Sequence, residues 1–148
     1  MHLEKPELKR ILEDPNLPGL KRLGKLFFTP SQASQAAADR FVARLGQRKQ
    51  DREPVSGPGV AQGQMAAFRA WEGSTADRFR YLRQITQPCM VVNGVFDDMI
   101  SVRNSYALSE HLPNAMLLTY PDAGHGSLFQ YHHSFVKLAS LFLDEELG

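Results

Sequence analysis

The sequence predicts an α/β protein with a helical first part and a βαβα second part, and three observations carry the prediction. Apolar residues up to about Gln87 recur at helical spacing. After Pro88 two short unbroken apolar runs appear, typical of strands buried on both faces. Each run is followed by a helical pattern, which indicates parallel strands joined by a right-handed crossover. We therefore divide the chain into a helical segment, 1–86, and a strand-containing segment, 87–148.

Three helices are predicted in the first 50 residues. The first is PELKRILED, with Pro6 at its first position, where the missing N–H costs nothing. The second is GLKRLGKLFF, after a break at 15–19. We expect Thr29 to cap the third, with Pro30 at its first position. Its inner face repeats every four residues: Ala37, Phe41 and Leu45.

Two more helices are predicted before the first strand. After the turn-rich REPVSGPG, one helical face holds Ala61, Met65, Phe68 and Trp71. Ser74, followed by Asp77 three residues later, resembles a capping box that opens a fifth helix, ADRFRYLRQI. Such apolar faces are more often packing surfaces than cofactor sites, so we assign them no chemistry.

The strand-containing segment alternates regularly. CMVVNGV and AMLLTYP are the predicted strands, and SVRNSYALSEHL between them is a predicted helix with Ser101 as its cap. The inner side of this helix is expected to hold Val102, Tyr106 and Leu108 or Ser109. A final helix has an inner face made by Tyr131, Phe135, Leu138 and Phe142.

Composition excludes several classes of function. Seventeen Lys and Arg against sixteen Asp and Glu leave no charge excess to attract nucleic acid or an anionic membrane. No apolar stretch approaches the ~20 residues of a membrane span. The start, MHLEKPELKR, lacks the apolar core of a signal peptide. We therefore expect a cytoplasmic protein that binds neither nucleic acid nor membrane.

No cofactor or metal is expected. The single cysteine, Cys89, rules out an internal disulfide and a multi-thiolate metal site, and its apolar surroundings in the sequence indicate a buried structural thiol. The sequence contains no glycine-rich phosphate loop after a strand and no cluster of His and carboxylates at metal-ligand spacing.

The loops that follow the two strands hold the candidate site. Parallel strands end at the same edge of a sheet, and sites in such sheets lie just beyond those carboxyl ends. Asp97 follows the first strand and His125 the second, so we predict that they lie side by side although 28 positions separate them. A carboxylate that accepts a hydrogen bond from an imidazole is the orienting half of a nucleophilic triad.

The motifs NGVFDDMI and NSYALSEHLPNAMLLTYPDAGHGSLFQY resemble the C-terminal region of α/β-hydrolase fold proteins. In that family the catalytic acid lies three residues after a glycine at the end of the penultimate strand, and the catalytic histidine follows the last strand in a GHG or GHS context. The resemblance implies that Asp97 is the acid and His125 the histidine. It covers 87–148, while 1–86 resembles the lid that many members insert before the acid-bearing strand. The implied fold class is the C-terminal portion of an α/β-hydrolase fold.

The sequence offers alternatives to these assignments. Asp98 could be the acid, but the spacing from Gly94 favours Asp97. Asp122 is interpreted as a turn-former. The remaining histidines are expected at the surface: His2, His111, His132 and His133. We expect the glycines on either side of His125 to let the loop turn sharply, so that the ring points at the nucleophile.

The family's nucleophile motif is missing from the sequence. A hydrolase of this fold needs a serine in G-x-S-x-G upstream of the acid, and none of the ten serines has glycine at both positions. The oxyanion-hole loop and the earlier strands are missing too. We therefore expect a fragment or truncated member of the family, inactive alone, that would act on a small-molecule ester or other acyl compound only if completed upstream. Its lid aromatics are candidate substrate lining: Phe27, Phe28, Phe68 and Trp71.

The alternative expectation is a non-catalytic remnant that serves as an interaction module. Two strands alone leave a sheet edge unpaired and apolar surface uncovered. This edge could pair with a second copy of the chain or with a complementing chain.

Overall fold

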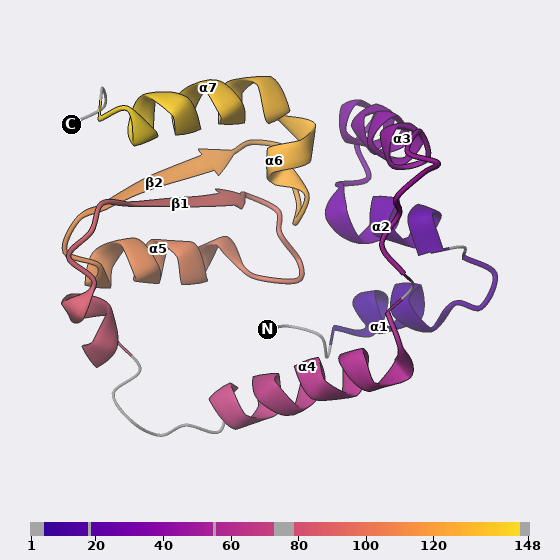
Figure 1. Ribbon diagram of the computed structural model, residues 1–148, viewed down its shortest axis with the longest axis horizontal. Helices are drawn as coiled ribbons and strands as arrows, with labels where there is room; N and C mark the ends of the chain where they lie inside the picture. Colours follow the sequence, from indigo (N-terminus) through magenta and orange to yellow (C-terminus); the bar gives the residue numbers. More distant parts are fainter. Residues whose placement is uncertain (1–4, 18, 55, 73–78, 146–148) are drawn as a thin grey trace.

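The structure is a computed structural model that describes residues 5–17, 19–54, 56–72 and 79–145. Its sheet has two parallel strands, β1 (Cys89–Gly94) and β2 (Ala115–Tyr120). Cys89 lies opposite Ala115 and Gly94 opposite Tyr120, so both strands end at the same level. Helix α5 (Val102–His111) lies over one face of the sheet and α7 (His132–Leu143) over the other, with the short α6 (Ser127–Gln130) before α7 (Figure 1). The predicted βαβα unit is confirmed.

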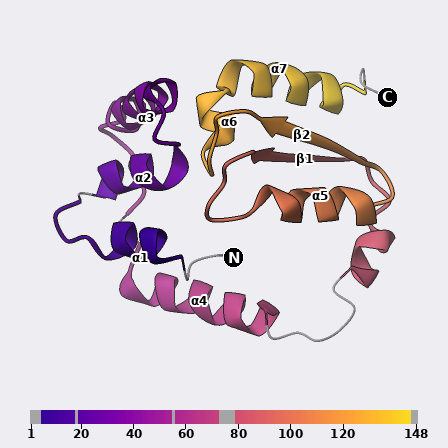
Figure 2. The same cartoon turned by 180° about the vertical axis from the view of Figure 1, so that it is seen from behind.

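Three helices of the N-terminal segment lie beyond the carboxyl ends of the strands, as both Figure 1 and Figure 2 show: α1 (Pro6–Glu13), α2 (Gly19–Phe27) and α3 (Gln32–Leu45). Pro6 occupies the first position of α1 as predicted. The predicted start of α3 is wrong. Ser31, not Thr29, is its cap, and the Ser31 hydroxyl accepts the Ser34 N–H at 3.1 Å. The Thr29 hydroxyl is engaged elsewhere, as described below.

The predicted fourth helix is confirmed as α4 (Pro58–Glu72). The rest of the described chain, however, does not bury its apolar face. Met65 and Phe68 are exposed, and Trp71 is 62% exposed. Figure 1 shows α4 apart from the sheet. Phe68 and Trp71 are thus surface side chains here. Of the predicted fifth helix, Ser74 and Asp77 lie outside the described residues, and Arg80–Gln84 form only a 3₁₀ turn, η1.

Helix α5 is rotated relative to the expected inner side. Tyr106 is 58% exposed, whereas the neighbouring Ser105 is buried. The Ser105 hydroxyl accepts a hydrogen bond from the Asn93 side chain at 3.0 Å, which draws Ser105 toward β1. The predicted cap is confirmed, since Ser101 accepts the Arg103 N–H at 3.3 Å.

The buried core lies between the N-terminal helices and α6 rather than under the sheet. Phe28, Ala37, Ala38 and Phe41 form its buried cluster, and Phe27 and Phe129 pack against it. The strands, predicted to be buried on both faces, are only half-buried over most of their length. Cys89 is a half-buried free thiol rather than a fully buried one. Among the described residues, no helix combines the length and apolar character that crossing a bilayer demands.

Candidate active site

The two predicted site residues lie together at the carboxyl edge of the sheet. Asp97 lies three residues beyond the end of β1 and His125 five residues beyond the end of β2. The Nδ1 atom of His125 lies 2.9 Å from the Oδ2 atom of Asp97. Because the register aligns the ends of the two strands, loops from distant parts of the sequence meet at this point.

The Asp97 carboxylate is buried and fully paired. Its side chain is 3% exposed. Oδ1 accepts the backbone N–H groups of Met99 and Ile100, each at 2.8 Å, which leaves Oδ2 for His125. These hydrogen bonds compensate for the burial of a charged group. The neighbouring Asp98 has a 68% exposed side chain that pairs with Lys5, so the geometry favours Asp97 as the partner of the imidazole.

The hydrogen bond to Asp97 defines the tautomer of the His125 imidazole. A carboxylate only accepts, so the shared hydrogen belongs to Nδ1 of the imidazole. Nε2 has no partner among the described residues, and the side chain is 29% exposed. The ring packs edge-on against Phe27, with centroids 5.2 Å apart and planes at 65°. His125 therefore presents Nε2 as an available base and is held on its other side.

The glycines around His125 provide close approach rather than the expected sharp turn. No described glycine has a positive φ. A Cβ on Gly124 would lie 2.8 Å from the carbonyl oxygen of Phe27, and one on Gly126 would lie 2.8 Å from the Phe27 Cβ. A Cβ on Gly94 would lie 2.3 Å from the carbonyl oxygens of Ala123 and Gly124. Only glycine lets the histidine loop lie this close to β1 and to the end of α2.

A family model described as "TAP-like protein" matches residues 53–146, which is more than half of the chain. The chain belongs to the TAP-like family of the α/β-hydrolase superfamily. A solved structure, an alpha/beta hydrolase fold protein from Chitinophaga pinensis, is 32% identical and superimposes with a TM-score of 0.84. The match covers 97% of this chain and 50% of that one, so the chain spans about half the length of this relative. No curated protein matches the chain.

In this α/β-hydrolase family member, the junction between α2 and α3 is bonded to the histidine loop. The Gly126 N–H donates to the carbonyl oxygen of Phe27 at 2.8 Å. The Thr29 hydroxyl donates to Oδ1 of Asp122 at 2.6 Å, and the Ser31 hydroxyl donates to Oδ2 at 2.5 Å. The hydrogen bonds from Ser31 and Thr29 lower the pKa of the Asp122 carboxyl. We call residues 27–34 together with 121–130 the clasp.

Asp122 combines two roles, of which the sequence indicated one. Its φ of 47° is the left-handed conformation of a turn residue, as interpreted from the sequence. Its carboxylate also anchors the clasp, which the sequence did not indicate. Gln130 extends the same network, because its side-chain oxygen accepts from the Ser34 hydroxyl at 2.8 Å and its nitrogen donates to the Asp122 carbonyl at 2.8 Å. The one available signal was the row of hydroxyl residues in TPSQAS, whose partners lie more than 90 positions away.

A second network holds the loop that bears Asp97. The Asn93 side chain accepts the N–H of Gly94 at 2.8 Å and donates to the carbonyl oxygen of Ile100 at 3.1 Å. It also donates to the buried Ser105 of α5. Asn93 therefore ties together both ends of the acid-bearing loop, and the sequence analysis did not single it out.

The other predicted positions differ in outcome. His133 is exposed as expected, while His132 is half-buried at the start of α7. His111 is half-buried rather than at the surface, because its ring stacks on Phe79 with centroids 4.0 Å apart. His2 lies outside the described residues. The described residues hold no group of three or more His, Cys, Asp and Glu side chains able to bind a metal ion.

Proposed function

We propose that this chain is the acid- and histidine-bearing half of a serine-type α/β-hydrolase that cleaves esters or related acyl compounds. The observation that supports this most is the hydrogen bond between His125 and the buried, fully paired Asp97 at the carboxyl edge of parallel strands. The relative that superimposes on this chain is about twice as long. We propose that the nucleophile lies in sequence upstream of the chain, in the same polypeptide or in a complementing one.

In the proposed mechanism each atom of the pair has one task. The serine oxygen attacks the substrate carbonyl while Nε2 of His125 takes the serine proton. The same nitrogen then returns that proton to the leaving alcohol. Nδ1–H keeps donating to Asp97, which stabilises the imidazolium that forms between these two steps. Water repeats the sequence on the acyl-enzyme.

Ser127 is the serine nearest to His125 in the sequence, but it does not suit the role of nucleophile. It is 4% exposed and begins α6, after the histidine in the chain. A nucleophile in this fold precedes both the acid and the histidine and stands exposed on a strand-to-helix turn. We therefore expect the chain by itself to hydrolyse no ester above background.

The intact mass of the protein from its natural source is the first test. A mass near 16.6 kDa would identify the short chain as the product, and co-purification of a partner with G-x-S-x-G would then support the complementing form. A mass about twice as large would support a single polypeptide, because a complete domain of this fold needs roughly 250 residues. In either complete form, a fluorophosphonate probe should label the serine, and labelling should be lost in His125→Ala.

Ester turnover by the isolated chain is the opposing result. If the 148-residue chain hydrolyses p-nitrophenyl acetate, and His125→Ala alone abolishes the rate, the proposed need for an upstream nucleophile is wrong. A His133→Ala variant is the matched control, since His133 is an exposed histidine outside the Asp97 pair.

A second candidate function is a non-catalytic module that oligomerises through the sheet edge. Among the described residues, β1 pairs with β2 and with no other strand, and the apolar strand residues are only half-buried. Val136 and Leu143 of α7 are exposed as well. Pairing of β1 with a second copy would cover this surface. Light scattering should then show a discrete oligomer whose β1 amides are protected from hydrogen exchange; a folded monomer at micromolar concentration would contradict it.

A further inference from the structure

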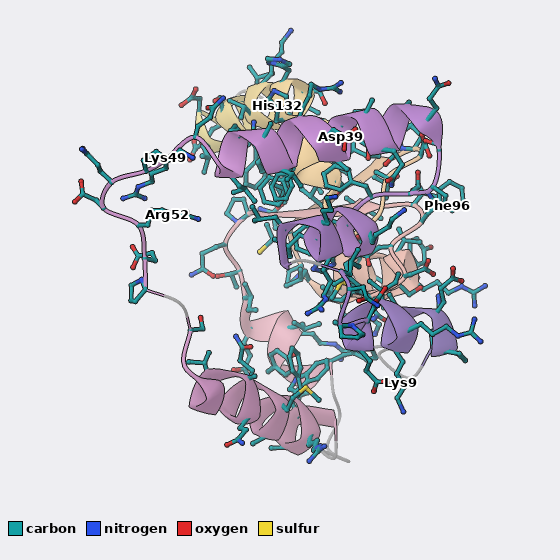
Figure 3. All side chains as sticks on the ribbon, turned by 90° about the vertical axis from the view of Figure 1, so that its right-hand side faces the viewer. Lys9, Asp39, Lys49, Arg52, Phe96 and His132 are labelled. Carbon is teal, nitrogen blue, oxygen red and sulfur yellow. The ribbon has the colours of Figure 1, made fainter. Side chains whose placement is uncertain are left out.

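A pocket of about 250 Å³ lies between α3, α6 and α7, and neither Asp97 nor His125 is among its lining residues. Two arginines of α3, Arg40 and Arg44, line it together with His132. Figure 3 shows His132 beside α3. We infer that this pocket binds a small organic oxyanion, a carboxylate or a phosphate monoester that carries a flat apolar group.

The charges on the pocket wall favour an anion. Arg40 and Arg44 are one helical turn apart, so their like charges repel each other when the pocket is empty. Neither arginine has a hydrogen-bond or ion-pair partner among the described residues, and no Asp or Glu lines the pocket. The planar guanidinium group of arginine pairs well with carboxylate and phosphate oxygens. An oxyanion between the two side chains would replace their repulsion with two charge-assisted contacts.

The rest of the lining selects for a flat apolar group. Phe41 and Phe129 form an aromatic wall, with ring centroids 4.7 Å apart. Phe129 is held further by Phe27, whose ring is parallel to it at 6.3 Å, so the wall does not need to rearrange. The volume is below the ~300–1,000 Å³ of pockets for drug-sized ligands, which favours a ligand with a single ring.

Two further side chains supply polar contacts at the rim. The Nδ1 atom of His132 lies 3.2 Å from the carbonyl oxygen of Phe129, and since a carbonyl accepts, Nδ1 carries the hydrogen. This contact fixes the imidazole beside the aromatic wall. Gln47 also lines the pocket, and its side-chain amide can donate to an oxyanion. The site therefore combines charge, amide donors and an apolar wall, as ligand pockets do.

Binding of three probes to the 148-residue chain tests the inference. Benzoate and phenyl phosphate carry the two oxyanions, and benzyl alcohol is their neutral counterpart of similar size. Titration at constant ionic strength, followed by the NMR signals of the His132 ring, should give saturable one-to-one binding of at least one oxyanion. Benzyl alcohol should have an affinity at least about tenfold lower, because it lacks the charge that the arginines recognise. The tighter of the two oxyanions identifies the ligand class.

Three variants test whether the oxyanion binds in this pocket. Arg40→Gln and Arg44→Gln should each weaken the oxyanion about tenfold, since each removes one charge-assisted contact. Arg103→Gln changes an exposed arginine on α5 and should leave the affinity unchanged. All three positions are exposed, so the fold should persist, which circular dichroism would verify. Equal binding of benzyl alcohol, an equal loss in Arg103→Gln, or no saturation with either oxyanion would overturn the inference.

Discussion

The Oδ2 atom of Asp97 lies 2.9 Å from the Nδ1 atom of His125, although the two residues are 28 positions apart in the chain. The contact depends on two further features. Asn93 ties both ends of the acid-bearing loop, and the clasp holds the histidine loop against the end of α2. The pair is therefore set by the packing of the whole carboxyl edge of the sheet.

Replacing Asp97 with asparagine should invert the tautomer of His125. The asparagine oxygen can still accept from Met99 and Ile100, so its NH₂ group is left facing Nδ1. An imidazole nitrogen opposite a donor must be the acceptor, and the hydrogen then moves to Nε2. Nitrogen-15 NMR of the ring should show Nδ1–H in the wild type and Nε2–H in Asp97→Asn. In the completed enzyme, kcat should fall by about 10⁴-fold.

Asp98→Asn is the matched control for that substitution. Its exposed carboxylate pairs with Lys5, whereas Asp97 is the partner of the imidazole. The Nδ1–H tautomer should persist in this variant. The same tautomer in wild type and Asp97→Asn would show that Asp97 does not orient the ring.

Gly94→Ala should destabilise the chain strongly. The new methyl group would lie 2.3 Å from two backbone carbonyl oxygens of the histidine loop, which cannot move without breaking the register at the site. We expect a loss of about 1–3 kcal/mol or more in the free energy of unfolding, measured with urea. The control is Gly24→Ala, a buried glycine of α2 whose methyl group would meet Ala38 at an ordinary 3.7 Å. It should leave stability unchanged or raise it by up to about 1 kcal/mol.

Phe27→Ala should loosen His125 as well as lower stability. Phe27 packs against Phe41, Phe129 and the imidazole. Since Phe27 is half-buried, we expect a loss of about 2–4 kcal/mol, near the lower end of the range for core Phe→Ala changes. Phe96→Ala, at a 62% exposed position in the acid-bearing loop, should cost less than about 0.5 kcal/mol. A Phe27→Ala variant as stable as Phe96→Ala would contradict the proposed packing.

The clasp should make stability depend on pH in the acid range. Hydrogen bonds from Ser31 and Thr29 lower the pKa of Asp122 below its usual value of 3.8. Between these two values the unfolded chain binds more protons than the folded one, so stability rises with pH there. The contribution of Asp122 is therefore complete above about pH 4 and disappears as the pH falls through the pKa of the folded state.

Asp122→Asn measures that contribution directly. Its thermal midpoint should lie below that of the wild type at pH 6, and the difference should shrink as the pH falls below about 4 and the wild-type carboxyl takes up its proton. Asp39→Asn, at an exposed position of α3, should show no such trend. A difference that is constant from pH 6 to pH 2 would mean that the charge of Asp122 does not stabilise the clasp.

Local patterns predicted the parallel strands, α5, and the position of Asp97 beside His125. These features are encoded by residues close in sequence, and the rule that parallel strands end at one edge supplied the long-range step. The same reasoning failed at the α3 cap, where both Thr29 and Ser31 carry a suitable hydroxyl. Both hydroxyls donate to Asp122, more than 90 positions away, and it is the Ser31 hydroxyl that also accepts the Ser34 N–H.

By itself the sequence determined the order of the elements, the family resemblance and the two candidate residues, because periodicity, caps and glycine spacing are local properties. Only the tertiary structure decided that the glycines are needed for close approach, that the apolar face of α4 is exposed, and that Asp122 anchors the histidine loop. Each of these depends on which backbone or side chain lies opposite. Apolar spacing shows that a face can be buried, but the partner that covers it is fixed only when distant segments pack together.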